Sequence, residues 1–179
     1  RARELPVLLL GKGLKRPLVV TDRGLAGTPL VSTLLDNLKS SGLDPILFGD
    51  VDPNPTDMNV RDGAAAFSAH SADALVALGG GSGLDGGKSI AMVAKSGYPL
   101  ERFEWTLEPV SLPPGTIPPI VTMPTTAGTG AEMASASMCT DTTKRIKICV
   151  EHQDAAKDFT VIADPELTLT LPPHLTAWT

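Results

Sequence analysis

The chain has 179 residues, of which 42% are apolar and 20% are charged, and this composition is typical of a folded globular domain rather than a disordered chain. Acidic residues outnumber basic ones 20 to 15, so general affinity for nucleic acid is not expected. Apolar runs such as Val7 to Leu10 are too short for a membrane span or a signal peptide, and two cysteines fit a reducing compartment, so the predicted location is the cytoplasm.

Short apolar runs alternate with segments of helical period, which predicts an α/β fold with helices flanking an open parallel sheet. Strands are predicted at 18–21, 46–48, 74–78, 120–123 and 160–163, with a further hairpin of 136–140 and 146–150. Helices are predicted at 29–40, from Thr56 or Asp57 to about His70, and at 83–95. The segment Pro109 to Pro119 holds five prolines in eleven residues and is typical of a rigid surface connector. The last residues resemble the first turn of a helix, so we expect a piece of a longer protein.

A glycine-rich loop, Gly79 to Ser89, joins the third predicted strand to the next helix. Glycines let backbone N–H groups approach a phosphate closely, and a helix N-terminus favours an anion, so the loop predicts an anionic ligand. Its glycines fit the dinucleotide pattern G-x-G-x-x-G, which normally follows the first strand of the sheet. A Walker A loop would need glycine where Ser82 stands. The structural alternative is a helix that packs closely on the sheet through its glycines.

A second loop, Pro124 to Glu132, also follows a predicted strand and contains three threonines and two glycines. Hydroxyl groups at the carboxyl edge of an open α/β sheet can hydrogen-bond a ribose or a pyrophosphate, and a plain capped turn is the alternative. Asp22 ends the first predicted strand, where its carboxylate could accept both hydroxyls of an adenosine ribose or simply cap a helix. Both loops and Asp22 would meet at one edge of the sheet.

These segments resemble the iron-containing (group III) alcohol dehydrogenase family, in order and spacing, over nearly the whole chain. The matching segments are Gly11-Lys12-Gly13, Val20-Thr21-Asp22, Asn54-Pro55-Thr56, Gly79 to Ser82 with Asp85 and Lys88, Pro124 to Gly130 with Glu132, Thr140-Asp141, Lys147, Asp164 to Thr168 and Leu171-Pro172-Pro173. The resemblance implies a Rossmann-like N-terminal domain, 1–179, that binds NAD or NADP, with 172–179 beginning the link to a helical metal-binding domain absent from this chain. It further implies hydride transfer between the nicotinamide and a small alcohol or aldehyde, and a homo-oligomer at full length.

The resemblance also implies roles for individual residues. Gly80, Gly81 and Ser82 would grip the pyrophosphate, Asp22 would hold the adenosine ribose, and Asn54 would lie by the adenine. Lys147 would lie near the nicotinamide ribose and is the candidate catalytic residue. The remaining cofactor contacts implied are Asp85, Lys88, Thr125, Thr126, Thr129, Lys144 and Leu167.

Some features depart from the family pattern or lie outside the chain. Ala131 stands where the family frequently has serine. Gly86-Gly87 stands directly before Lys88, where the family usually has Thr or Ser and then Ala. The metal ligands of the family, for Fe²⁺ or Zn²⁺, are one Asp and three His that would follow Thr179. His70, His152 and His174 lack ligand spacing, and we expect them at the surface or at helix ends.

Three alternatives to an alcohol dehydrogenase remain at this point. A dehydroquinate-synthase-like enzyme and a glycerol dehydrogenase would share the two-domain plan, and a non-catalytic nucleotide-binding module would need no second domain. The segments Pro124 to Gly130 and Asp164 to Leu167 fit the alcohol dehydrogenase pattern better. NAD is expected over NADP, because a carboxylate at Asp22 would repel a 2′-phosphate unless Arg23 turned toward it.

Overall fold

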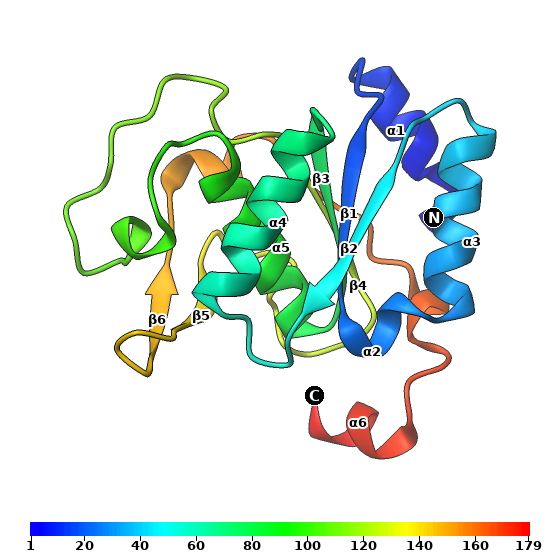
Figure 1. Ribbon diagram of the computed structural model, residues 1–179. Coiled ribbons are helices and arrows are strands. Elements are labelled where there is room, and N and C mark those ends of the chain that lie inside the picture. Colours follow the sequence, from blue (N-terminus) through cyan, green and yellow to red (C-terminus); the bar gives the residue numbers. More distant parts are fainter.

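The computed structural model describes residues 1–179, and its centre is a five-stranded parallel sheet with helices on both faces (Figure 1). The strand order is β2-β1-β3-β4-β7. The bounds of these strands are β1 (Pro17–Asp22), β2 (Ile46–Val51), β3 (Ala74–Gly79), β4 (Ile120–Pro124) and β7 (Phe159–Val161). The predicted α/β class, with an open parallel sheet and flanking helices, is confirmed.

Six α-helices surround the sheet, and none is long and apolar enough to cross a membrane. They are α1 (Leu5–Gly11), α2 (Arg23–Ala26), α3 (Pro29–Ser40), α4 (Asp57–Ala69), α5 (Gly81–Ala94) and α6 (Pro173–Trp178). Four short 3-10 helices cover Ala2–Glu4, Leu100–Phe103, Gln153–Ala156 and Pro165–Thr168. The predicted helices 29–40, 56–70 and 83–95 are confirmed, whereas α1 and α2 were not predicted.

Local sequence explains where the confirmed helices begin. Pro29 occupies the first turn of α3, where a missing N–H costs nothing. Thr56 and Asn59 form a capping box at the start of α4, with the Asn59 amide 3.1 Å from the Thr56 hydroxyl and the Thr56 amide 3.0 Å from the Asn59 side chain. The Asn59 side chain also donates to the Asp50 carbonyl, so the same residue fastens α4 to the end of β2.

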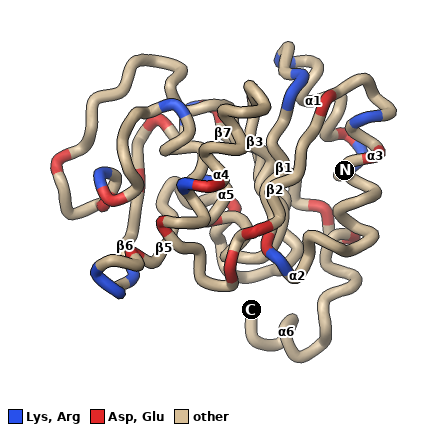
Figure 2. The backbone as a smooth tube through the Cα atoms, in the orientation of Figure 1, with Lys and Arg blue, Asp and Glu red and all other residues tan.

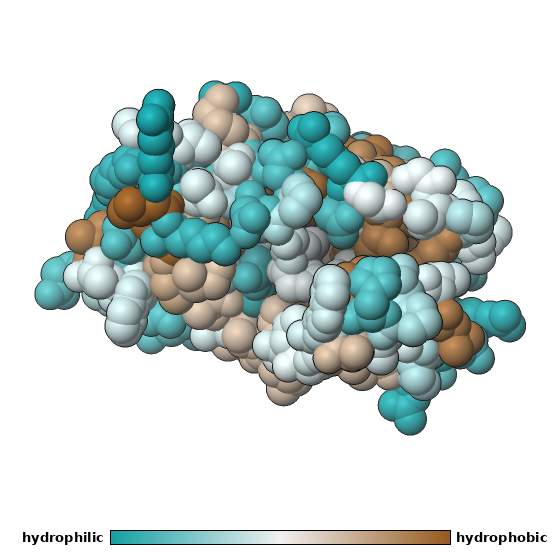
Figure 3. Space-filling model, turned by 90° about the horizontal axis from the view of Figure 1, so that it is seen from below, coloured by the Kyte–Doolittle hydropathy of each residue, from teal (hydrophilic) through white to brown (hydrophobic).

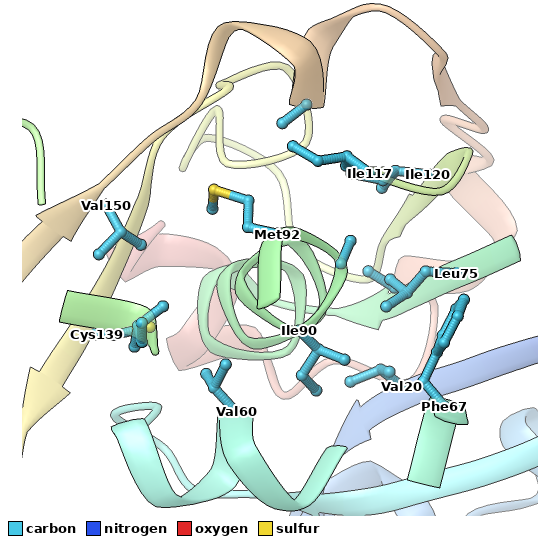
Figure 4. Close-up of a cluster of buried hydrophobic side chains, with 14 of the residues drawn as sticks. Val20, Val60, Phe67, Leu75, Ile90, Met92, Ile117, Ile120, Cys139 and Val150 are labelled. Carbon is cyan, nitrogen blue, oxygen red and sulfur yellow. The ribbon is translucent and has the colours of Figure 1, made fainter. Parts of the chain in front are cut away.

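The hydrophobic core has two parts, one on each face of the sheet. Helices α1 and α3 cover one face, where Val19, Val76 and Val121 are buried. Helices α4 and α5 cover the other face, and Figure 4 shows α5 surrounded by side chains from α4, the strands and the connector before β4. Successive residues of a strand point to opposite faces, and in β1 Leu18 and Val20 face α5 whereas Val19 faces α3. The central strands are therefore buried on both faces.

A separate antiparallel hairpin, β5 (Ser137–Asp141) and β6 (Ile146–Val150), lies beside α5 and forms part of the connection from β4 to β7. The predicted hairpin is thus confirmed, with Thr140 opposite Lys147. Glu104 bridges Val150, so a short extended segment borders the outer edge of β6. The proline-rich connector contains no strand or helix.

The strand order places a switch point at the middle of the sheet. From β1 the chain crosses through α3 to β2 on one side, and then returns through α4 to β3 on the other side of β1. The crossover helices thus lie on opposite faces, and the loops that follow β1 and β3 diverge. Ligands of open α/β sheets bind in the crevice at such a point, beyond the carboxyl ends of the strands.

Candidate functional site

The crevice at the switch point is bounded by Asp22, which ends β1, and by the glycine loop, which follows β3. Asp22 caps α2, because its Oδ1 accepts from the amides of Gly24 at 2.9 Å and Leu25 at 3.2 Å. Its Oδ2 faces the glycine loop and would lie 3.2 Å from a Cβ placed on Gly79. The helix-cap and ribose-acceptor interpretations therefore use different oxygens of one carboxylate.

The glycines of the loop divide into two groups with different surroundings. A Cβ on Gly83, Gly86 or Gly87 would lie 2.5 to 2.8 Å from atoms of β2 or β3, so these three allow α5 to pack closely on the sheet. A Cβ on Gly81 would have nothing nearer than the Thr129 side chain at 3.9 Å. Gly79 has φ +147°, which favours glycine and permits the tight turn from β3 into α5. The packing interpretation thus holds for Gly83, Gly86 and Gly87, whereas the open position is that of Gly81.

The N-terminus of α5 points its free amides at this open position. Gly80 is the N-cap and supplies no side-chain hydrogen bond, so the first amides of the helix lack a capping partner. The Ser82 hydroxyl donates to the Pro53 carbonyl, which ties the helix start to the loop that contains Asn54. Asn54 itself is exposed and directly follows Pro53. Unsatisfied amides and the helix dipole together suit a pyrophosphate.

The threonine loop forms the facing wall. The Thr125 amide donates to the Gly79 carbonyl at 2.9 Å, so the wall is joined directly to the end of β3. The Thr126 hydroxyl oxygen is buried without a hydrogen-bond partner, and a Cβ on Gly80 would lie 3.2 Å from the Thr126 methyl group. A buried hydroxyl without a partner beside an uncapped helix end fits a polar ligand. Thr129 is exposed, across from Gly81.

Five of the predicted residues line one pocket of about 290 Å³, namely Asp22, Gly80, Thr125, Thr126 and Leu167. Its other lining residues are Leu25, Thr170, Leu171, Pro172 and Leu175, none of which was a predicted site residue, because apolar side chains carry no chemical signature of a binding site. Figure 3 views the molecule from this edge and shows pale residues of intermediate hydropathy across the middle of the face. A larger pocket of about 590 Å³, beside α3, shares only Leu167 with the predicted set.

Other predicted residues lie outside this pocket. Lys147 is exposed on β6, and Lys144 pairs with Asp141 at 3.3 Å in the hairpin turn. The amide of Lys144 also donates to Asp141 and lowers the pKa of that carboxyl. Asp85 and Lys88, both in α5, form an ion pair at 3.0 Å, and Lys88 has no exposed side-chain surface. Neither residue lines the pocket described above.

Residues that could hold a metal or act as a nucleophile are not gathered. No three His, Cys, Asp or Glu side chains are placed to hold a metal ion. His70 ends α4 and His174 lies in α6, as expected, whereas His152 caps a 3-10 helix while being buried. Burial raises the pKa of Cys139 to about 12, so this residue is a protonated thiol near neutral pH.

Comparison with known proteins gives consistent matches. The family model for iron-containing alcohol dehydrogenase matches residues 1–165. Choline dehydrogenase of Bacillus subtilis is 35% identical over 93% of this chain and 41% of its own length, and NAD-dependent methanol dehydrogenase of Bacillus methanolicus is 34% identical over 97% of this chain and 44% of its own. This chain therefore spans less than half the length of these relatives.

Solved structures show the same arrangement. A crystal structure of 1,3-propanediol oxidoreductase superimposes with a TM-score of 0.88 at 34% identity, over 98% of this chain and 45% of that one. Sulfoacetaldehyde reductase from Bifidobacterium kashiwanohense, crystallised in complex with NAD⁺, gives a TM-score of 0.88 at 29% identity, over 99% of this chain and 46% of that one.

Proposed function

Because this chain belongs to the iron-containing alcohol dehydrogenase family, as its N-terminal portion, we propose that it is the NAD-binding part of an enzyme that transfers hydride between NAD and a small alcohol or aldehyde. The observation that carries the proposal is the convergence of Asp22, the uncapped N-terminus of α5 and the threonine loop on one crevice. Residues 1–179 would form the nucleotide-binding domain, and 172–179 would begin the link to the rest of the enzyme.

Each wall of the crevice has a distinct task in this proposal. The amides at the start of α5 would hold the pyrophosphate, and the Thr126 hydroxyl, which has no partner in the protein, would donate to it or to a ribose. The Asp22 Oδ2 would accept from the adenosine ribose while Oδ1 keeps α2 capped. NAD, when bound, supplies the hydride acceptor, and these residues orient it. Lys147 would lie toward the nicotinamide ribose.

The preference for NAD over NADP is part of the proposal. Arg23 follows Asp22 in the sequence, and its Nε lies 3.4 Å from Asp52 and 3.8 Å from Asp50, so it already pairs with two carboxylates. Figure 2 shows a blue, basic segment at α2 next to red, acidic segments near the end of β2. A 2′-phosphate would meet three carboxylates here, and to pair with it Arg23 would have to leave its present partners.

The residues of this chain do not form a site that fits a divalent metal. The proposal concerns binding and orientation of the dinucleotide, with turnover belonging to the full-length enzyme. Small alcohols and aldehydes are proposed as substrates because relatives such as NAD-dependent methanol dehydrogenase act on a small alcohol.

A titration and an activity measurement on the full-length protein test the proposal. NADH fluorescence should report saturable binding, and reduction of NAD should depend on a small primary alcohol such as propane-1,3-diol. Binding without turnover on any alcohol would support a nucleotide-binding module instead. Absence of NADH binding would contradict the assignment of the crevice.

A further inference from the structure

A single ammonium group joins α5 to the segment that follows the threonine loop. The Lys88 Nζ donates hydrogen bonds to the carbonyl oxygens of Ala131 at 2.8 Å, Ala134 at 3.1 Å and Ala136 at 2.7 Å. The Asp85 Oδ1 lies 3.0 Å from the same nitrogen and supplies the opposite charge. Four oxygen atoms therefore surround one nitrogen, and the Lys88 side chain has no exposed surface.

The segment 131–136 depends on this group for its hydrogen bonds. It contains no helix or strand, and no backbone amide donates to the three carbonyls. An ammonium has three N–H donors, one for each carbonyl, whereas an apolar side chain of similar length would leave all three unpaired. The Asp85 Oδ2 also accepts from the Met138 amide at 3.0 Å, so the pair holds the start of strand β5 as well.

The same segment continues directly from the wall that faces the glycine loop. The Ala131 amide donates to the Thr129 hydroxyl at 3.3 Å, and the Glu132 carbonyl accepts from the Thr122 hydroxyl at 3.0 Å. Helix α5 carries the opposite wall at its N-terminus and Lys88 two turns later. Lys88 thus adds a second link between the threonine loop and α5, beside the hydrogen bond from the Thr125 amide to the Gly79 carbonyl.

We infer that Lys88 and Asp85 are positioning residues that form an internal cation site, in which a tethered ammonium holds the two walls at the separation a dinucleotide requires. This inference rests on the proposed function. Lys88 acts through the backbone of 131–136 and has no surface with which to touch a ligand, unlike the direct cofactor contact that the family resemblance implies for it. The site would bind no free cation while Lys88 fills it.

Replacement of Lys88 by methionine, in the full-length protein, tests the inference. Lys88→Met keeps most of the side-chain volume and removes the three donors, so amide hydrogen exchange should rise in peptides covering 125–136. The dissociation constant for NADH should rise about tenfold or more, the equivalent of losing one hydrogen bond to a charged group. Lys95→Met is the matched control, because Lys95 lies at the far end of the same helix beside Phe67 and should leave both measurements unchanged.

Chemical rescue gives a second test that does not depend on the folding of Lys88→Met. Lys88→Ala, refolded with n-propylammonium, should recover slow exchange in 125–136 and tight NADH binding, because this ion restores the missing atoms and three N–H donors. Tetramethylammonium carries the charge without donors and should not restore them. Equal recovery with both ions, or with neither, would overturn the inference.

The readouts separate failure of this inference from failure of the proposed function. Wild-type protein that does not bind NADH contradicts the proposed function, whereas the exchange measurement still tests the cation site. Wild-type protein that binds NADH, together with a folded Lys88→Met variant of unchanged affinity or unchanged exchange in 125–136, overturns the cation site alone.

Discussion

Gly81 is the glycine whose side-chain position is open to the crevice. Gly81→Val would place methyl groups where the pyrophosphate is proposed to lie, without contact with the sheet. We expect the affinity for NADH to fall at least about tenfold, or about 1.4 kcal/mol, with little change in melting temperature. Titration of NADH fluorescence and thermal unfolding check this. Gly27→Val, at another position with open space, should bind normally, and normal binding by Gly81→Val would remove the loop from the site.

Asp22 determines cofactor choice in the proposed site. With Arg23 held by Asp50 and Asp52, wild-type enzyme should prefer NAD, and Asp22→Gly should reduce that preference by about 1–3 kcal/mol, the scale of one hydrogen bond to a charged group. The measurement is kcat/KM for both cofactors in the full-length enzyme. Asp36→Asn, on the exposed face of α3, should change neither value. A wild-type preference for NADP would be incompatible with the assignment.

Site residues were predictable where the residue type itself has a clear chemical or conformational role. Asp22, Gly81 and Thr126 stand at strand ends in patterns with a clear physical meaning, and the structure brings them to one crevice. The partners of Lys88 could not be predicted, because they are carbonyl groups of three alanines 43 to 48 residues away. Backbone acceptors are the same in every residue, so no sequence pattern marks them.

Among the helices, α5 depends most directly on close contact with the sheet. A Cβ on Gly87 would lie 2.5 Å from the Cβ of Ala77, so Gly87→Ala must push the helix away from β3. We expect a loss of about 1–3 kcal/mol in the free energy of unfolding, larger than the gain of up to about 1 kcal/mol from helix propensity. Denaturant unfolding measures the difference. Gly11→Ala, in α1 with open space around it, is the control and should not destabilise the protein.

Element boundaries were predictable where residues that typically begin or end a helix agree with the spacing of the apolar residues. Helix α3 begins at Pro29 and ends at Ser40 as predicted, because proline marks its first turn and leucines recur at helical spacing. Helix α1 was missed, since the unbroken run Val7 to Leu10 shows no period. Helix α2 has four residues, too few for any periodic signal. The bridge between Glu104 and Val150 joins segments far apart in sequence and has no local signature.

At the scale of the whole molecule, Asp164 joins the two ends of the chain. Its Oδ2 accepts from the Ala2 amide at 2.7 Å, and its Oδ1 accepts from the Glu166 amide at 3.1 Å. The hydrogen bond from Ala2 is the main cause that lowers the pKa of Asp164 to about 2. The ionised carboxylate is therefore favoured more in the folded protein than in the unfolded chain.

The lowered pKa of Asp164 determines how its contribution to the stability of the fold changes with pH. The stabilisation from Asp164 should be complete above the ordinary carboxyl pKa of about 4 and should be lost as the pH falls toward about 2, since the unfolded chain takes up the proton first. Asp164→Asn should be less stable than wild type at neutral pH, with the difference shrinking in acid. Urea midpoints between neutral and strongly acidic pH measure this, with Asp36→Asn as the control. A constant difference across that range would contradict the linkage.

The connection from β4 to β7 has an evolutionary consequence. Parallel neighbours are usually joined through an α-helix packed on the sheet, but here the crossover contains the β5–β6 hairpin and the short 3-10 helix Gln153–Ala156 and no α-helix. The inner residues Cys139 and Ile148 are buried, whereas Met138 and Lys147 on the outer face are exposed. Apart from Lys147, which is proposed to lie toward the nicotinamide ribose, residues on that outer face can change while the inner residues and the sheet stay unchanged. A lineage could thus diversify the surface next to the crevice without altering the scaffold that folds it.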